Sequence, residues 1–218
     1  MTIRTSRPLP DQVFIEARER ILSGRLPADA PIRQDALALE LGVSKIPLRE
    51  ALARLESEGL VVSHPNRGFI VRPLSRADAE DVFDLRLRIE PNACVLGALG
   101  ADAAAHEAAR TAFAALDAAL KNGLADVGRR NREFHLALVR PSGRAVTIET
   151  VDRLLALSER YVRVHLGEHR RLDRASHEHE ILLNAWLERR TETVRREARG
   201  HIRATLVDLR AQLPGVWR

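Results

Sequence analysis

LALELGVSKIPLREALARLESEGLVVSHPNRGFIV, residues 37–71, is the stretch that decides the fold. A short apolar helix pattern stops at Gly42, and the side-chain oxygen of Ser44 is suited to cap a second helix. That helix ends at Gly59, a residue that readily adopts the left-handed conformation after a helix terminus. One face of the second helix carries Leu48, Leu52 and Leu55.

Two strand-like runs, residues 60–63 and 69–71, follow the second helix. The residues Pro65-Asn66-Arg67-Gly68 lie between them and have the composition of a turn. Helix, tight turn, helix and hairpin form the order of a winged helix-turn-helix, which places its second helix in the DNA major groove. The stretch therefore predicts a DNA-reading domain.

The rest of the chain extends this domain and adds a second one. We expect residues 1–72 to form the winged helix-turn-helix domain, residues 73–77 to be a linker, and residues 78–218 to be a helical domain. No strand pattern occurs after the linker, and the helix-type runs predict an antiparallel all-helical bundle in a mainly α fold. The expected helices span residues 76–90, 93–120, 126–139, 144–167, 174–190 and 193–212.

Composition narrows the class of protein. The net charge is +5, and residues 1–72 account for only +2 of it, so the local placement of charge matters more than its total. Cys94 is the single cysteine, and no apolar run reaches 18 residues, which together favour a cytoplasmic protein without a membrane span. The motifs HExxH, GxSxG, Walker A and GxGxxG are absent, so the sequence does not predict an enzyme.

Motifs in both halves resemble one family. The N-terminal half resembles GntR-type transcriptional regulators through Leu41-Gly42-Val43-Ser44, Pro47-Leu48-Arg49-Glu50-Ala51-Leu52, Glu58-Gly59-Leu60-Val61 and Asn66-Arg67-Gly68-Phe69. The C-terminal half resembles the FCD domain of the FadR-like subfamily through Arg86 and Glu90, Phe134-His135, His179 and His201-Ile202. The resemblance implies an effector-binding helical bundle with a central cavity.

The candidate DNA-binding residues lie on the second helix and the wing. Lys45 and Arg49 are one helical turn apart, and Arg49 can form a forked contact with a guanine edge or a phosphate. Lys45 and the hydroxyl of Ser44 suit phosphate oxygens, whereas Arg67 lies at the tip of the wing. The alternative is a solvated surface of ordinary charges. The candidate set is Arg33, Ser44, Lys45, Arg49, His64 and Arg67.

A metal site is predicted in the bundle. Asn131 and His135 share a helix face, while His179 faces the core and His177 points away from it. Each histidine taken alone would be an ordinary hydrogen-bonded core residue. Their spacing resembles the metal site of the family, although the resemblance implies that Asp is common at the position of Asn131. The predicted ligands of a divalent transition metal such as zinc or nickel are Asn131, His135, His179 and His201.

Arg86 matches a family position that lines the effector cavity, and it would suit a small carboxylate; an ion pair with Glu90 is the alternative. The combined hypothesis is a homodimeric DNA-binding regulator that recognises a two-fold symmetric operator and responds to a small organic acid. The resemblance implies repression that the ligand relieves. Two alternatives stay open: a metal-dependent enzyme and a pure metal sensor or structural metal site, both built on the same bundle.

Overall fold

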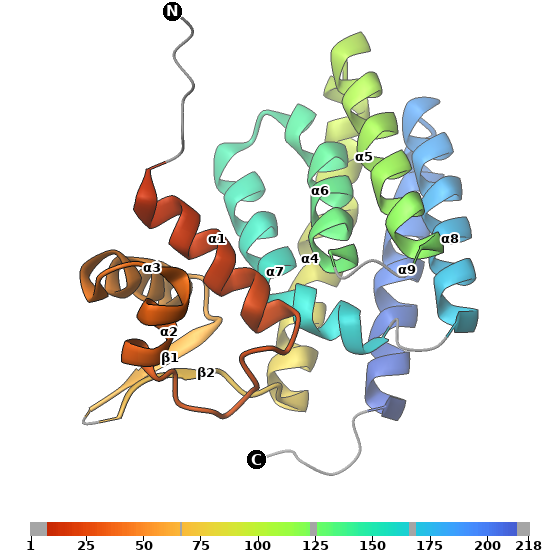
Figure 1. Cartoon of the computed structure of the whole chain (residues 1–218). Coiled ribbons are helices and arrows are strands. Elements are labelled where there is room, and N and C mark those ends of the chain that lie inside the picture. Colours follow the sequence, from red (N-terminus) through yellow and green to blue (C-terminus); the bar gives the residue numbers. More distant parts are fainter. Residues whose placement is uncertain (1–7, 66, 123–125, 166–168, 213–218) are drawn as a thin grey trace, which may run out of the picture. The chain divides into compact units, whose positions relative to one another are not determined.

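The computed structural model describes residues 8–65, 67–122, 126–165 and 169–212 (Figure 1). The chain divides into two compact units, Met1–Leu74 and Ser75–Arg218. Asn66, in the middle of the predicted wing turn, lies outside the described residues.

The first unit is a winged helix-turn-helix, as the sequence predicts. Its helices are α1 (Leu9–Leu22), α2 (Gln34–Leu41) and α3 (Lys45–Ser57), and its strands are β1 (Val61–His64) and β2 (Gly68–Val71). The strands pair in antiparallel register, with Val61 opposite Val71 and His64 opposite Gly68. Each strand is shifted by one residue from its expected start.

The turn between α2 and α3 forms at Gly42, whose φ of 65° lies in the left-handed region that favours glycine. Ser44 occupies the position before the first turn of α3, but its side chain makes no capping hydrogen bond, contrary to expectation. The core beneath α3 instead holds this helix in place, because its apolar face is fully buried. That face consists of Leu48, Ala51, Leu52 and Leu55.

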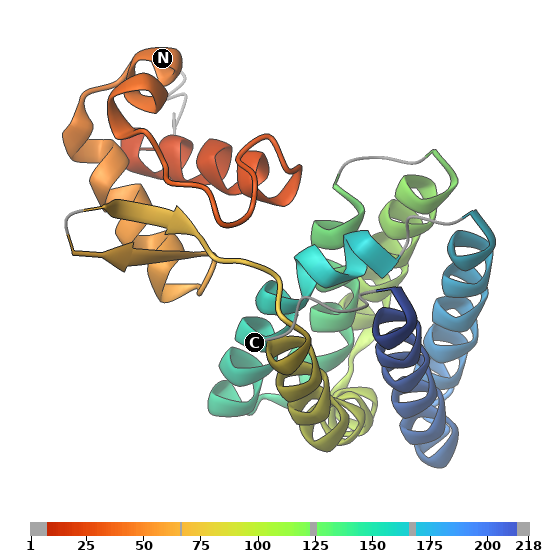
Figure 2. The same ribbon diagram turned by 90° about the horizontal axis from the view of Figure 1, so that it is seen from below.

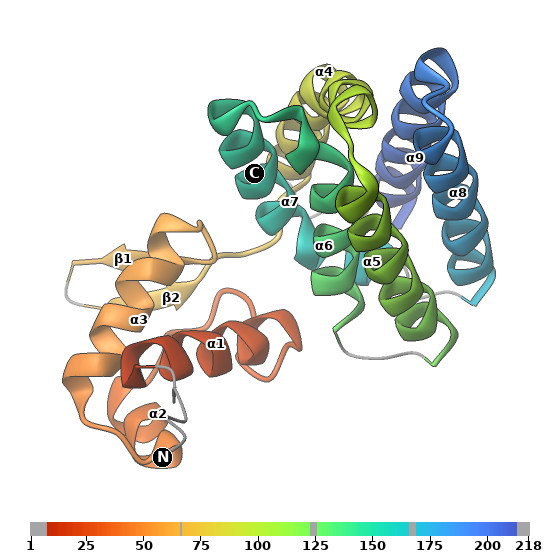
Figure 3. The same ribbon diagram turned by 90° about the horizontal axis from the view of Figure 1, so that it is seen from above.

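The second unit is all-helical in its described residues. Its helices are α4 (Arg76–Gly100), α5 (Ala103–Lys121), α6 (Val127–Val139), α7 (Ala145–His165), α8 (His169–Leu187) and α9 (Thr191–Gln212). Helix α4 packs against α7 and α9, and α5 packs against α6 and α8 (Figures 2 and 3). The resulting core surrounds Phe134, Leu138 and Trp186, which are fully buried. The mainly α fold class is therefore confirmed.

Helix α4 differs from the sequence prediction. A break was expected at Pro91, yet the helix continues through this proline to Gly100. Burial on both sides of Pro91 offsets the lost backbone hydrogen bond, because Glu90, Ala93 and Cys94 are all in the core. The chain breaks instead at residues 101–102, where Asp102 caps α5 by accepting a hydrogen bond of 2.8 Å from the N–H of Ala105.

Close approach of backbones explains two glycines of α4. A Cβ atom added at Gly97 would lie 1.9 Å from the carbonyl oxygen of Leu138. A Cβ atom added at Gly100 would lie 2.3 Å from the carbonyl oxygen of Pro141. Only glycine therefore lets α4 lie this close to the end of α6, and that contact helps to set where α6 presents its side chains.

The start of α4 is fixed by two hydroxyl groups. Ser75 caps the helix by accepting a hydrogen bond of 3.2 Å from the N–H of Asp78. The hydroxyl of Tyr161 on α7 accepts from the N–H of Ser75 and donates to its carbonyl oxygen, both at 3.1 Å. The point where the chain enters the bundle is thus tied to α7. Among the described residues, no helix is both long and apolar enough to cross a membrane.

Candidate metal centre and DNA-reading surface

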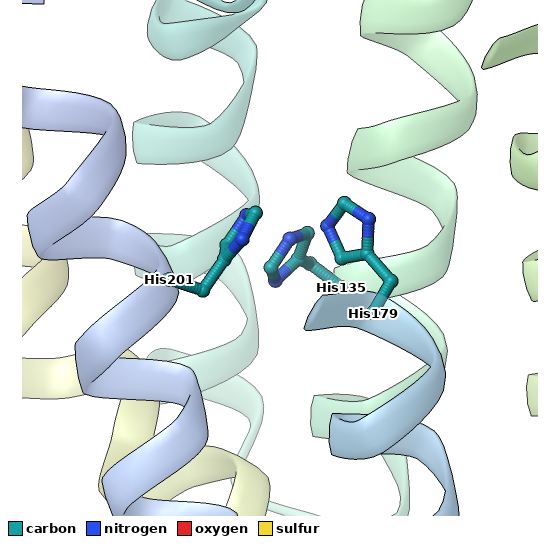
Figure 4. Close-up of side chains that lie close together, drawn as sticks. All are labelled: His135, His179 and His201. Carbon is teal, nitrogen blue, oxygen red and sulfur yellow. The ribbon is translucent and has the colours of Figure 1, made fainter. Parts of the chain in front are cut away.

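Three histidines from three helices converge inside the bundle. His135 comes from α6, His179 from α8 and His201 from α9 (Figure 4). One ring nitrogen of each lies within 4.8 Å of the others, and their side chains are 0%, 2% and 8% exposed in that order. The helical phase of the sequence predicts this inward direction, and it also predicts the outward direction of His177, which is exposed.

The hydrogen bonding differs among these three rings. Nδ1 of His201 shares a hydrogen bond of 2.7 Å with Oε2 of Glu178. Neither ring nitrogen of His135 or His179 has a hydrogen-bond partner among the described residues. Nδ1 of His135 does lie 2.7 Å from Oε1 of Glu90, but this contact does not have the geometry of a hydrogen bond. Buried polar atoms without partners cost free energy, which a metal ion would offset.

The low pKa of His179 favours the binding of a cation at this site. Burial, followed by the nearby rings of His201 and His135, holds the pKa of His179 well below its usual value. His179 is therefore a neutral imidazole at neutral pH, the form that donates a lone pair to a metal. The carboxylate of Glu178 also suits this role, because metal-binding histidines commonly share their second nitrogen with a carboxylate.

Beside the histidines lies a buried ion pair. Nε and Nη2 of Arg86 donate to the two carboxylate oxygens of Glu90 at 2.8 and 3.2 Å. Burial alone would raise the pKa of Glu90, but the charges of Arg86 and His135 outweigh it and hold that pKa well below its usual range. The sequence offered this ion pair as the alternative to an effector contact, and the structure shows the ion pair.

A small cavity lies beside Arg86 and the histidines. Its volume is about 10 Å³, enough for one water-sized sphere. The side chains that line it are Arg86, Asn131, Val162, Ala175, His179, His201 and Thr205. Asn131 is thus where the helical phase predicted it, whereas Thr205 and Glu178 were missed. Thr205 could have been found from its spacing, since it is one turn after His201. Glu178 could not, because its contact with His201 depends on how α8 packs against α9.

The second candidate site is the surface of the first unit. All six predicted DNA-binding residues are exposed there: Arg33, Ser44, Lys45, Arg49, His64 and Arg67. His64 and Arg67 flank the wing turn, where the N–H of Arg67 donates to the carbonyl oxygen of His64 at 3.2 Å. Arg33 directly precedes α2, and Ser44 directly precedes α3.

Two residues of α2 contact the cations of α3, and the sequence analysis missed both. Nε of Arg49 donates to Oε1 of Gln34 at 3.3 Å, and Nζ of Lys45 lies 2.5 Å from Oδ1 of Asp35. Gln34 also lies beside the wing, because a Cβ atom added at Gly68 would lie 3.1 Å from its Nε2 atom. The first turn of α2 therefore orients the cationic side chains of α3.

Comparison with known proteins gives matches to both units. Residues 9–71 match the gntR family of bacterial regulatory proteins, and residues 81–204 match the FCD domain. The relative named "Uncharacterized HTH-type transcriptional regulator BphR", from Paraburkholderia xenovorans (strain LB400), is 28% identical over 94% of this chain and 86% of its own length. The HTH-type transcriptional repressor GlaR of Escherichia coli (strain K12) is 31% identical over 65% of this chain and 66% of its own length.

Solved structures share the fold. The chain of E. coli McbR/YncC superimposes with a TM-score of 0.81 at 21% identity, covering 95% of this chain and 99% of its own. A regulator from Rhodococcus sp. RHA1, described as a putative GntR transcriptional regulator, gives a TM-score of 0.80 at 19% identity and covers 94% and 98% of the two chains. At this level of identity the likeness is one of fold.

Proposed function

Because this chain belongs to the GntR family of transcriptional regulators and contains an FCD domain, we propose that it is a repressor whose operator binding is relieved by a small carboxylate bound beside a metal ion. The family and the relatives are regulators of transcription and not enzymes, so the metal-dependent enzyme considered above is set aside. DNA binding follows from the winged helix-turn-helix unit. The repressor role draws on relatives such as GlaR, which is named a repressor.

The metal part of the proposal rests on one observation, the buried ring nitrogens of His135 and His179 that have no hydrogen-bond partner among the described residues. Together with His201 they would hold the ion, and Asn131 would supply a weak fourth ligand from the wall of the same cavity. FCD domains commonly bind metal. Neutral imidazoles favour zinc, nickel or cobalt over magnesium. The bound ion would supply a positive charge and a position open to an anionic ligand.

The charges of the site favour a carboxylate as effector. The three histidine rings and the amide of Asn131 bring no negative charge, so these ligands would leave the charge of a divalent ion uncompensated. Arg86 also contributes to the cavity, and its Nη1 atom is not engaged by Glu90. An anion between the metal and Arg86 would therefore meet positive charge on two sides. The Nε and Nη2 atoms of Arg86 are held by Glu90, so Arg86 would offer Nη1 rather than its full fork.

A pure metal sensor is the second candidate, and the size of the cavity favours it. About 10 Å³ accommodates an ion or a water molecule but not an organic acid. A carboxylate effector would have to move α7, α8 or α9 apart, whereas a metal ion would not. The two candidates therefore differ in whether an organic ligand changes operator affinity once the metal is bound.

We further propose that the protein acts as a homodimer on a two-fold symmetric operator. One recognition helix per monomer reads a half-site, and two half-sites one helical turn of DNA apart give the usual specificity. Sedimentation of the protein with and without an operator duplex measures this directly. A monomer that binds its operator tightly would contradict it.

The decisive experiment uses the full-length protein stripped by a chelator and reloaded with Zn²⁺ or Ni²⁺. Elemental analysis gives the bound metal, and fluorescence anisotropy gives operator affinity with and without a panel of small mono- and dicarboxylates. An acid that weakens operator binding only in the loaded protein supports the proposed function. Metal that acts alone, with no effect of any acid, supports the metal sensor. Absence of metal uptake would refute the metal centre and leave DNA binding intact.

A further inference from the structure

Ile46 is an apolar side chain in an unusual place. It lies in the first turn of α3, directly after Lys45 and three residues before Arg49, and it is 71% exposed. The core beneath α3 does not use it, because the buried apolar residues of this helix are Leu48, Ala51, Leu52 and Leu55. Ile46 is therefore free to contact a partner of the helix.

The partner of this helix is DNA, so the inference rests on the DNA-binding part of the proposed function. Residues at the start of a recognition helix contact base edges in the major groove. Residues three and four apart share a helix face, so Ile46 and Arg49 point to the same side, with Lys45 next to them. Two cations, which suit phosphate and guanine, thus flank one apolar group.

We propose that Ile46 recognises thymine through its 5-methyl group. Among the base edges of the major groove, the thymine methyl group is the one apolar feature that an isoleucine can match. Guanine, cytosine and adenine lack this methyl group and present mainly hydrogen-bond donors and acceptors there, and an isoleucine placed against those would bury polar atoms without partners. Ile46 would therefore select a thymine at one position of each half-site.

A single exposed apolar residue is common on protein surfaces and needs no function by itself. The chain offers a direct comparison, because Leu39 on α2 is 83% exposed. Leu39 lies outside the recognition helix, on the helix that crosses the DNA backbone in this type of domain. Position on α3, and not exposure alone, distinguishes Ile46, and the two residues form a matched pair for the test.

The experiment replaces thymine by uracil, a change that removes the methyl group and keeps base pairing. Operator duplexes are first selected from a random-sequence pool with the full-length protein. Each thymine of the selected duplex is then replaced by uracil in turn, and the dissociation constant is measured by anisotropy. At one thymine per half-site we expect a loss of about fourfold, which corresponds to one buried methyl group.

Three variants complete the test. Ile46→Ser should bind the thymine and uracil duplexes equally, whereas Ile46→Val should keep part of the preference. Leu39→Ser, the matched control, should keep the full preference of the unaltered protein. Because both side chains are exposed, we expect the melting temperatures of all variants to stay close to that of the parent.

Two results would overturn the proposal. The first is a selected operator in which no thymine is sensitive to loss of its methyl group. The second is a sensitive thymine whose fourfold loss persists in Ile46→Ser, which would assign the methyl group to another residue. Failure to select any duplex would refute DNA binding itself, and the role of Ile46 with it, so the two failures are distinguishable.

Discussion

Arg86 and Glu90 lie one turn apart on α4 and are joined by two hydrogen bonds in the fully buried interior, where Glu90 also contacts His135. Removal of either partner would leave an uncompensated buried charge. We therefore expect Arg86→Ala and Glu90→Ala each to lower the free energy of unfolding by about 3–5 kcal/mol. Urea unfolding followed by circular dichroism measures this. The double variant Arg86→Met/Glu90→Leu should be closer to the parent than either single variant, and additive losses would contradict the pairing.

Glu178 is expected to act through His201. Its carboxylate shares a hydrogen bond with Nδ1 of His201. This bond fixes the orientation of the ring, and Nε2 would then be the nitrogen that binds the metal. We predict that Glu178→Gln lowers zinc affinity by about 10- to 100-fold, the usual cost of losing such a partner. Competition with a chromophoric chelator gives the affinity. Glu180→Gln, on the exposed side of the same helix, is the control and should have no effect.

Asn131 contributes no charge to the predicted metal site. Asn131→Asp would supply a negative charge from within, so the metal should bind more tightly and an anionic effector more weakly. Calorimetric titration of the metal, followed by a carboxylate, measures both changes. Tighter binding of both ligands in this variant would show that charge compensation does not control the effector.

Arg49 is expected to carry the largest share of base recognition. Arg49→Ala should weaken operator binding by about 1–3 kcal/mol, the value of a good bidentate contact. Lys45→Ala should chiefly reduce the salt dependence of binding, because its partner would be a phosphate. Gln34→Ala should weaken specific binding more than non-specific binding, since Gln34 holds Nε of Arg49. Operator affinity that is unchanged in all three variants would exclude this surface.

Cys94 is expected to be chemically inert in the folded protein. Burial, with a smaller contribution from Glu90, raises the pKa of its thiol well above the usual value, so the thiolate is scarce even at pH 8. A chromogenic disulfide reagent should therefore react with Cys94 only after unfolding in denaturant. Rapid reaction of the native protein at pH 8 would mean that this region of α4 opens readily.

The sequence predicted the winged helix-turn-helix and the all-helical second unit because both follow from local patterning. Gly42 and the leucines of α3 indicate the first, and apolar periodicity indicates the second. The same rules failed at Pro91, where tertiary burial overrides the local preference of proline. Helical phase also indicated which histidines point inward.

The partners that candidate residues find on other helices could not be predicted, because they depend on how the helices pack together. Glu90 on α4 meets His135 on α6, and Gln34 on α2 meets Arg49 on α3. The size of the cavity depends on packing too, and it bears directly on the choice between an organic effector and a metal alone.

The hydroxyl of Tyr161 binds both backbone polar groups of Ser75, and the next residue, Val162, lines the histidine cavity. These two hydrogen bonds tie the start of the bundle to α7. A ligand that displaced Val162 would also move Tyr161, because the two residues are joined by one peptide bond. That movement would reach Ser75 through the two hydrogen bonds of Tyr161. Tyr161→Phe would remove both hydrogen bonds and leave the space filled. If the movement passes through Tyr161, this variant should still bind its ligand, but ligand binding should no longer change its affinity for operator DNA.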